Sequence, residues 1–216
     1  MSSVERETIA RREPIRKAEP TAELVRDFWR QMTRAYGSRV IDKRSAWEMR
    51  LVGMFLDRIK VLDETEFLRR YTTTIGKRIY MPFDVGVPHE HYSLWNQITV
   101  CVHEHQHVEQ LLRDGWLKFA GRYLVTSAAR AAYEAEAFRC NMELHFWRFG
   151  EIPDLKKLAR RLEHYGCDQA DIDMAERMLE LSVATVRRGG IVNWASQKAI
   201  SWLERHAPEL KHEERE

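Results

Sequence analysis

The sequence is poor in cysteine: Cys101, Cys140 and Cys167 are the only three among 216 residues, and no two of them stand in a CxxC spacing. An odd and widely spaced set argues against a disulfide framework and against a cysteine-based zinc knuckle. Cys101 precedes His103 by two positions, which puts it off the helix face that His103 shares with His107. We therefore interpret Cys101 as a small core residue.

Neither sign of charge is in excess. The 35 Lys and Arg residues against 33 Asp and Glu residues give a formal net charge of +2, which is too balanced to indicate a nucleic-acid partner. No apolar run approaches the length of a membrane span, and residues 1–20 lack the apolar segment of a signal peptide. We expect a cytoplasmic protein without membrane or nucleic-acid partners. The sequence does not indicate its oligomeric state.

The most informative stretch is His-Glu-His-Gln-His at residues 103–107, inside a run without Gly or Pro at residues 94–112 that predicts one helix. His103 and His107 are four residues apart, so they lie on the same helix face and can reach one ion. Glu104 lies one step round the helix, near that ion but not aimed at it. This is the HExxH arrangement, in which two histidines bind zinc and the glutamate polarises the metal's water.

Two interpretations of this stretch compete: a metal site, or a polar helix face that is simply solvated. The predicted helix is apolar both before the motif and after it, at Ile98, Val102, Val108 and Leu111 among others, which favours a buried helix. Ionisable side chains on a buried helix are costly unless they are paired, and metal ligation supplies the pairing. His105 points away from the face of the other two histidines, so we do not count it as a ligand.

A catalytic zinc site needs a third protein ligand and an open position for water. The next predicted helix offers the sequence Tyr-Glu-Ala-Glu-Ala at residues 133–137, in which small alanines flank two carboxylates. Glu134 and Glu136 point roughly 200° apart on a helix, so only one of them can face the ion. The spacing alone does not decide between them.

Together, the HExxH stretch and the Glu-containing helix resemble the zincin metallopeptidases, in particular the gluzincins, whose third ligand is a glutamate. They are also similar to small bacterial peptidases that cleave phage repressors or act as stress-response regulators. The resemblance covers about residues 77–145. It implies that Glu134 is the third ligand, since Glu134 and Ala137 match the family's Glu-x-x-Ala, whereas Phe138 stands where those families have Asp or Asn.

The resemblance also implies an edge strand before the motif helix that binds extended substrate. Residues 77–82, bounded by Gly76 and Pro82, are rich in strand-forming side chains, and the proline suggests an edge position. A purely structural strand is the alternative.

Further side chains are candidates for roles around the metal. Three lie on one stripe of the helix that carries Glu134 and could orient ligands or stabilise an oxyanion: Arg130, Asn141 and His145. An ordinary salt bridge for Arg130 and a core position for His145 are the alternatives. Three hydroxyls could donate to a tetrahedral intermediate, and the sequence does not choose among them: Tyr92, Tyr123 and Tyr133.

The whole chain predicts a mainly α (α+β) fold: a zincin-like helix pair, a small edge sheet and a flanking helical bundle. Residues 1–20 are charged and carry two prolines, which suggests a flexible arm. Residues 21–216 read as a single domain, because no repeat or Pro/Ser-rich linker interrupts them. Its C-terminal helices span 151–208.

The periodicity and capping residues predict the individual elements. Helices are expected from residue 21 to Gly37 and from the capping box at Ser45 to about residue 59. A separate short helix is expected to end at about residue 70, and two longer ones are expected across 94–112 and 128–149. Three more are expected between 153 and 206, opened by Asp154, Asp168 and Asn193. Residues 116–125 are ambiguous, and 123–125 could be a short strand or part of an irregular turn.

These observations lead to a functional hypothesis: a zinc-dependent hydrolase, namely a peptidase, that holds Zn²⁺ with His103, His107 and Glu134 and uses Glu104 as general base on a protein or peptide substrate. One alternative is a zinc-stabilised structural or regulatory protein that cleaves nothing. Another is a metal-free helical interaction module. Metal removal separates them, because a structural site should lose its fold along with the metal.

Overall fold

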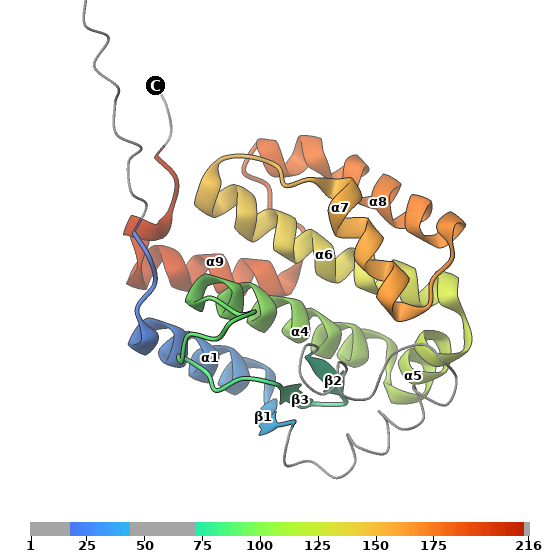
Figure 1. Ribbon diagram of the computed structural model, residues 1–216, viewed down its shortest axis with the longest axis horizontal. Helices are drawn as coiled ribbons and strands as arrows, with labels where there is room; N and C mark the ends of the chain where they lie inside the picture. Colours follow the sequence, from blue (N-terminus) through green and yellow to red (C-terminus); the bar gives the residue numbers. More distant parts are fainter. Residues whose placement is uncertain (1–17, 44–71, 214–216) are drawn as a thin grey trace, which may run out of the picture.

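The computed structural model describes residues 18–43 and 72–213 (Figure 1). The strands in these ranges are short: β1 (Arg39–Asp42), β2 (Thr73–Ile75) and β3 (Arg78–Met81). The α-helices are α1 (Ala22–Tyr36), α4 (Leu94–Asp114), α5 (Trp116–Val125), α6 (Ser127–Phe149), α7 (Leu155–Ala159), α8 (Gln169–Arg187) and α9 (Trp194–His206), with 3-10 turns η1 (Arg160–Tyr165) and η2 (Pro208–Leu210). The mainly α fold with a small sheet is thereby confirmed.

Local signals in the sequence account for the ends of the main helices. Thr21 accepts a hydrogen bond from the Leu24 amide at the start of α1, and Gly37 ends that helix in the left-handed conformation. Ser93 caps α4 in the same way, through the Asn96 amide. The predicted helices at 94–112 and 128–149 are confirmed to within two residues at each end.

The sheet has the strand order β1-β3-β2, with β1 parallel and β2 antiparallel to β3. The strand expected at residues 77–82 is confirmed as β3, but its expected edge position is wrong, because β3 pairs on both sides. Pro82 follows the last paired residue, Met81, so its missing N–H removes no bond from the sheet. Among the described strands, β2 is the edge strand next to α4.

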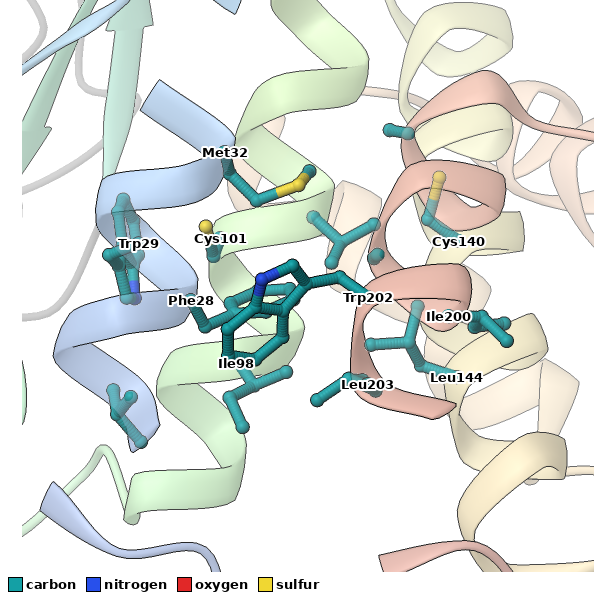
Figure 2. Packing of buried hydrophobic residues seen from close by; sticks show 14 of the residues in the cluster. Phe28, Trp29, Met32, Ile98, Cys101, Cys140, Leu144, Ile200, Trp202 and Leu203 are labelled. Atoms are coloured by element: carbon teal, nitrogen blue, oxygen red, sulfur yellow. The ribbon is translucent and has the colours of Figure 1, made fainter. Parts of the chain in front are cut away.

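The main core lies between α1, α4, α6 and α9. Figure 2 shows the Trp202 ring of α9 reaching toward Phe28 of α1 and Ile98 of α4, and the Phe28 and Trp202 rings meet edge to face at 5.5 Å. Cys101 is fully buried in this core, as the sequence indicated. A second apolar cluster joins α6 to α7 and α8, so the predicted C-terminal helices pack onto the helix that carries Glu134.

Residues 116–125 form the helix α5, so the suggested strand or irregular turn there is wrong. Phe119 and Tyr123 are four residues apart on α5, and both rings contact Tyr133 of α6, at 4.9 and 6.5 Å between centroids. This packing stabilises a ten-residue helix that would be marginal in isolation.

The ends and the gap in the described chain bear on the remaining expectations. Two of these expectations lie outside the described residues. They are the predicted helices between residues 45 and 70, and residues 1–17 of the expected arm. Residues 18–20 are attached rather than loose, because Arg148 donates to the Ala18 carbonyl and pairs with Glu19 at 2.9 Å. In the described ranges, no helix is both long enough and apolar enough to cross a membrane.

Candidate metal centre

The helices α4 and α6 are neighbours in the fold (Figure 1), and they bring the three predicted ligands together. The Nε2 atoms of His103 and His107 each lie 3.4 Å from a carboxylate oxygen of Glu134. One potential ligand atom from each of the three residues lies within 4.8 Å of the others. The exposed fractions are only 8%, 7% and 1%, so this is a buried group of two imidazoles and one carboxylate.

The positions of these residues on their helices determine which side chains face one another. The i, i+4 spacing stacks His103 and His107 on one face of α4, with ring centroids 5.0 Å apart. On α6, Glu134 is 1% exposed, and the fully buried Ala131 and Ala135 pack in the apolar cluster with α7 and α8. Glu136, which the spacing left as an alternative ligand, points elsewhere: it pairs with Arg113 at 2.9 Å. The structure therefore turns Glu134 to the histidines.

The electrostatics of this group fit a bound cation. Burial alone would raise the pKa of Glu134, but the neighbouring His107 and His103 outweigh burial and lower it to about 2. Burial opposes a charge on His103 as well, yet contact with Glu134 raises its pKa. One Glu134 oxygen, Oε2, is buried without a hydrogen bond. A buried carboxylate oxygen without a donor is the kind of group that a metal ion satisfies.

Gln110 sets the orientation of His107. The Nδ1–H of His107 donates to Gln110 Oε1 at 2.9 Å, and the Gln110 amide nitrogen donates to the Tyr133 carbonyl at 2.8 Å. A neutral His107 then has its lone pair on Nε2, facing the Glu134 carboxylate. Two facing lone pairs need a cation or a proton between them. Sequence reasoning missed Gln110, although its i+3 spacing from His107 on the same helix was the available signal.

Of the three candidate tyrosines, only Tyr123 contacts the group. Its hydroxyl donates to Glu134 Oε1 at 2.5 Å, and burial together with the Glu134 charge raises the pKa of Tyr123 well above its ordinary value. The Tyr133 hydroxyl donates to Asp114 instead, and Tyr92 packs on Phe83. Tyr123 comes from α5, the helix whose existence the sequence left open.

The three candidates on the α6 stripe do not join the group. Arg130 donates to the Tyr123 carbonyl, so it supports the α5–α6 connection. His145 lies near the end of α6, with its ring 4.6 Å from that of Phe149. Asn141 is half-buried, and its Oδ1 has no hydrogen-bond partner.

Glu104, the predicted general base, is buried against β2. Its carboxylate accepts hydrogen bonds from the Thr72 and Thr74 hydroxyls, the latter at 2.6 Å, one on each oxygen. Thr73, which points to the other side of the strand, accepts a bond from Lys43 at 2.9 Å. Burial lowers the pKa of Lys43 to about 7, against the effect of the Glu104 charge. Sequence reasoning missed these residues, because their link to Glu104 depends on tertiary pairing.

The other two motif residues face other neighbours, which confirms that His105 lies off the ligand face. His105 Nδ1 donates to the Cys101 carbonyl, Nε2 lies 2.9 Å from the Ser38 hydroxyl, and burial lowers the pKa of His105 to about 4. Gln106 accepts a weak bond from the Cys140 thiol of α6. These two side chains hold α4 against α1 and α6.

Comparisons of the chain with protein-family models, with curated proteins and with solved structures found no match to any of them. The function is therefore inferred from the geometry and chemistry of this site alone.

Proposed function

We propose that the protein is a zinc-dependent hydrolase that cleaves peptide bonds. The observation that carries this proposal is the convergence of His103, His107 and Glu134, with a buried Glu134 oxygen that lacks a hydrogen-bond donor. Two imidazoles and one carboxylate form one of the ligand sets of catalytic zinc, which leaves a fourth position open. Glu104 adjoins this set in sequence, which also supports the gluzincin resemblance.

In this proposal His103, His107 and Glu134 hold the ion, which when bound lowers the pKa of water and polarises a carbonyl. Glu104 accepts a proton from the attacking water and passes it to the leaving amine. Thr74 of β2 and Thr72, just before that strand, hold the Glu104 carboxylate in place. We further propose a cytoplasmic location, which is supported by three free and buried cysteines.

Two observations favour the alternative, a zinc-stabilised structural or regulatory protein. Both oxygens of Glu104 already accept hydrogen bonds from threonines, and a base that is held in this way has less freedom to collect a proton. The near-complete burial of the two histidines also limits the access of substrate. In that case the metal would hold α4 to α6 and cleave nothing.

The test compares metal content, fold and turnover in one set of variants. Elemental analysis of the purified wild type should show about one zinc per chain. Glu104→Gln should keep this zinc but lower turnover of an unstructured protein such as casein by about 10²–10⁴-fold. His107→Ala and Glu134→Ala should lose zinc, because each removes a ligand.

The possible outcomes separate the three hypotheses. Chelation should abolish turnover while circular dichroism still reports a folded helical protein. Loss of the fold on chelation, together with no cleavage across a broad protein panel, would favour the structural site. If Glu104→Gln loses its zinc, Glu104 is a ligand and the proposed mechanism is wrong. If the wild type contains no bound metal, the metal-free helical interaction module is the hypothesis that remains.

A further inference from the structure

A second binding site is indicated by a cavity of about 430 Å³ at the end of the sheet where β2 turns into β3. This volume lies within the range of about 300–1,000 Å³ that is usual for small-molecule sites. Its walls carry the exposed cations Arg39, Lys77 and Arg78 beside Ile75 and Trp116. No carboxylate is among the described residues that line it. The charge of its walls is therefore positive.

The register of the sheet places two of these cations side by side. Arg39 of β1 and Arg78 of β3 are partners in the parallel pair, and Ile75 of β2 is the partner of Arg78 on its other side. Partners in register project from the same face of a sheet, and neighbouring strands are only about 4.8 Å apart. Like charges in such positions repel one another. An anion bound between two guanidinium groups removes this repulsion and accepts hydrogen bonds from both.

The described part of the chain supplies little counter-charge to this cluster. Neither Arg39 nor Lys77 forms an ion pair with any described residue. The Lys77 ammonium lies 3.8 Å from where a Cβ at Gly37 would stand, which puts it at the C-terminal end of α1. The carbonyl groups of a helix end offer only a partial negative charge. Cations held close together in this way favour an anionic ligand.

Trp116 adds an aromatic surface to the cavity wall. It is the first residue of α5, and 51% of its surface is exposed. A half-exposed indole offers a flat face on which an aromatic ring stacks. The helix begins without a side-chain cap and without an acidic residue in its first turn. The positive end of its dipole therefore lies at the cavity as well, an arrangement that favours phosphate.

We propose that this cavity binds a nucleotide, with the phosphate groups on Arg39, Lys77 and Arg78 and the base stacked on Trp116. Guanidinium groups match the geometry of phosphate oxygens, and an ammonium adds a point charge. A nucleic-acid strand fits less well, because the chain has a net charge of only +2 and this cavity carries one exposed aromatic ring, whereas strand binding uses a longer basic groove with several rings.

The nucleotide site is separate from the candidate metal centre. Thr74 contacts Glu104, whereas the next residue, Ile75, lines the cavity, and successive side chains of a strand point to opposite faces. Nucleotide binding should therefore require neither a bound metal nor hydrolase activity. His107→Ala should bind ATP as the wild type does, which also distinguishes the cavity from direct contact between ATP and a zinc ion.

The experiment is isothermal titration calorimetry of the full-length protein with ATP, adenosine and inorganic tripolyphosphate. Arg39→Gln/Lys77→Gln removes two charges from the cavity. Both side chains are exposed, so the variant should stay folded, which circular dichroism checks. Arg160→Gln/Arg177→Gln removes two exposed charges from residues that do not line the cavity and is the matched control.

ATP should bind and adenosine should not. The cavity variant should weaken ATP binding by about tenfold or more, while the control changes it little. Trp116→Ala should weaken ATP binding by about fivefold or more, because a stacked base is lost, and should leave tripolyphosphate binding unchanged.

Three results would overturn the inference. The first is equal binding of ATP and adenosine, or no binding of either. The second is equal weakening by both double variants, which would indicate a general charge effect. The third is ATP binding that Trp116→Ala does not change, which would reduce the site to one for inorganic anions. Loss of ATP binding in His107→Ala would place the nucleotide at the metal centre instead.

Discussion

Gln110 offers a sharp test of the metal centre, because it contacts no ion itself and yet should control zinc affinity. It is fully buried on α4, and its Oε1 accepts the Nδ1–H of His107 at 2.9 Å. In Gln110→Leu the side chain keeps a similar volume but loses this acceptor. His107 then retains a buried donor without a partner, and its ring is no longer fixed with Nε2 toward Glu134.

The expected size of the effect follows from this contact. Loss of a hydrogen-bonding partner of a metal-ligating histidine lowers metal affinity by about 10–100-fold, which corresponds to about 1.4–2.7 kcal/mol at 1.36 kcal/mol per tenfold change. A buried donor left without an acceptor costs about 1–3 kcal/mol. Because the two ranges agree, zinc affinity measured by competition with a chelator should decrease by about 10–100-fold.

Gln97 provides a matched control on the same helix. It is also fully buried, and its side-chain amide binds the Gly86 amide at 2.8 Å and the Val87 carbonyl at 2.7 Å, away from the histidines. Gln97→Leu should lower the free energy of unfolding in urea about as much as Gln110→Leu does, but leave zinc affinity unchanged. If both variants bind zinc as the wild type does, His107 does not ligate through Nε2 in the orientation described.

Three further outcomes are expected. Tyr123→Phe should weaken zinc binding by about tenfold or more in the same chelator assay, because Glu134 loses a donor that orients it; Tyr133→Phe should leave the affinity unchanged. Burial lowers the pKa of Lys43 from 10.5 to about 7, so its charged form opposes folding. The stability of the wild type, measured by urea unfolding, should therefore rise with pH between about 7 and 10.5. Lys43→Met should lack this rise and should be more stable than the wild type below pH 7. Gly86→Ala should lower the unfolding free energy by at least about 1–3 kcal/mol, because its Cβ would stand 2.6 Å from the Ala22 carbonyl at a φ of +77°, and an unchanged thermal midpoint would contradict that geometry.

Periodic and capping signals were sufficient for most of the helical framework. Ser93, Asp154 and Asp168 each cap the helix that the sequence assigned to them. The same local logic placed His103 and His107 on one face, because a helix fixes that relation without help from the rest of the chain. Where local physics decided the outcome, the sequence was informative.

The parts that could not be predicted depend on contacts between distant residues. Pro82 suggested an edge strand, yet pairing of β3 with both β1 and β2 is decided by neighbours that no local pattern reveals. The α5 helix depends on Phe119 and Tyr123 packing against α6. The environment of Glu104 depends on β2, some 30 residues upstream. The sequence predicted that His103, His107 and Glu134 would converge, as they do, but it did not predict the residues that surround them.

The five motif residues face different parts of the molecule, and this has a consequence for tolerance to substitution. His103 and His107 face Glu134 of α6, whereas Glu104 is bonded to β2. His105 is hydrogen-bonded to Ser38 beside α1, and Gln106 accepts a hydrogen bond from the Cys140 thiol of α6. An ordinary amphipathic helix accepts changes at the positions that point to water, about every third or fourth residue. In a saturation mutagenesis screen for folded protein, all five residues from 103 to 107 should instead tolerate few substitutions. His105 and Gln106, which have no proposed chemical role, should be as intolerant as the other three.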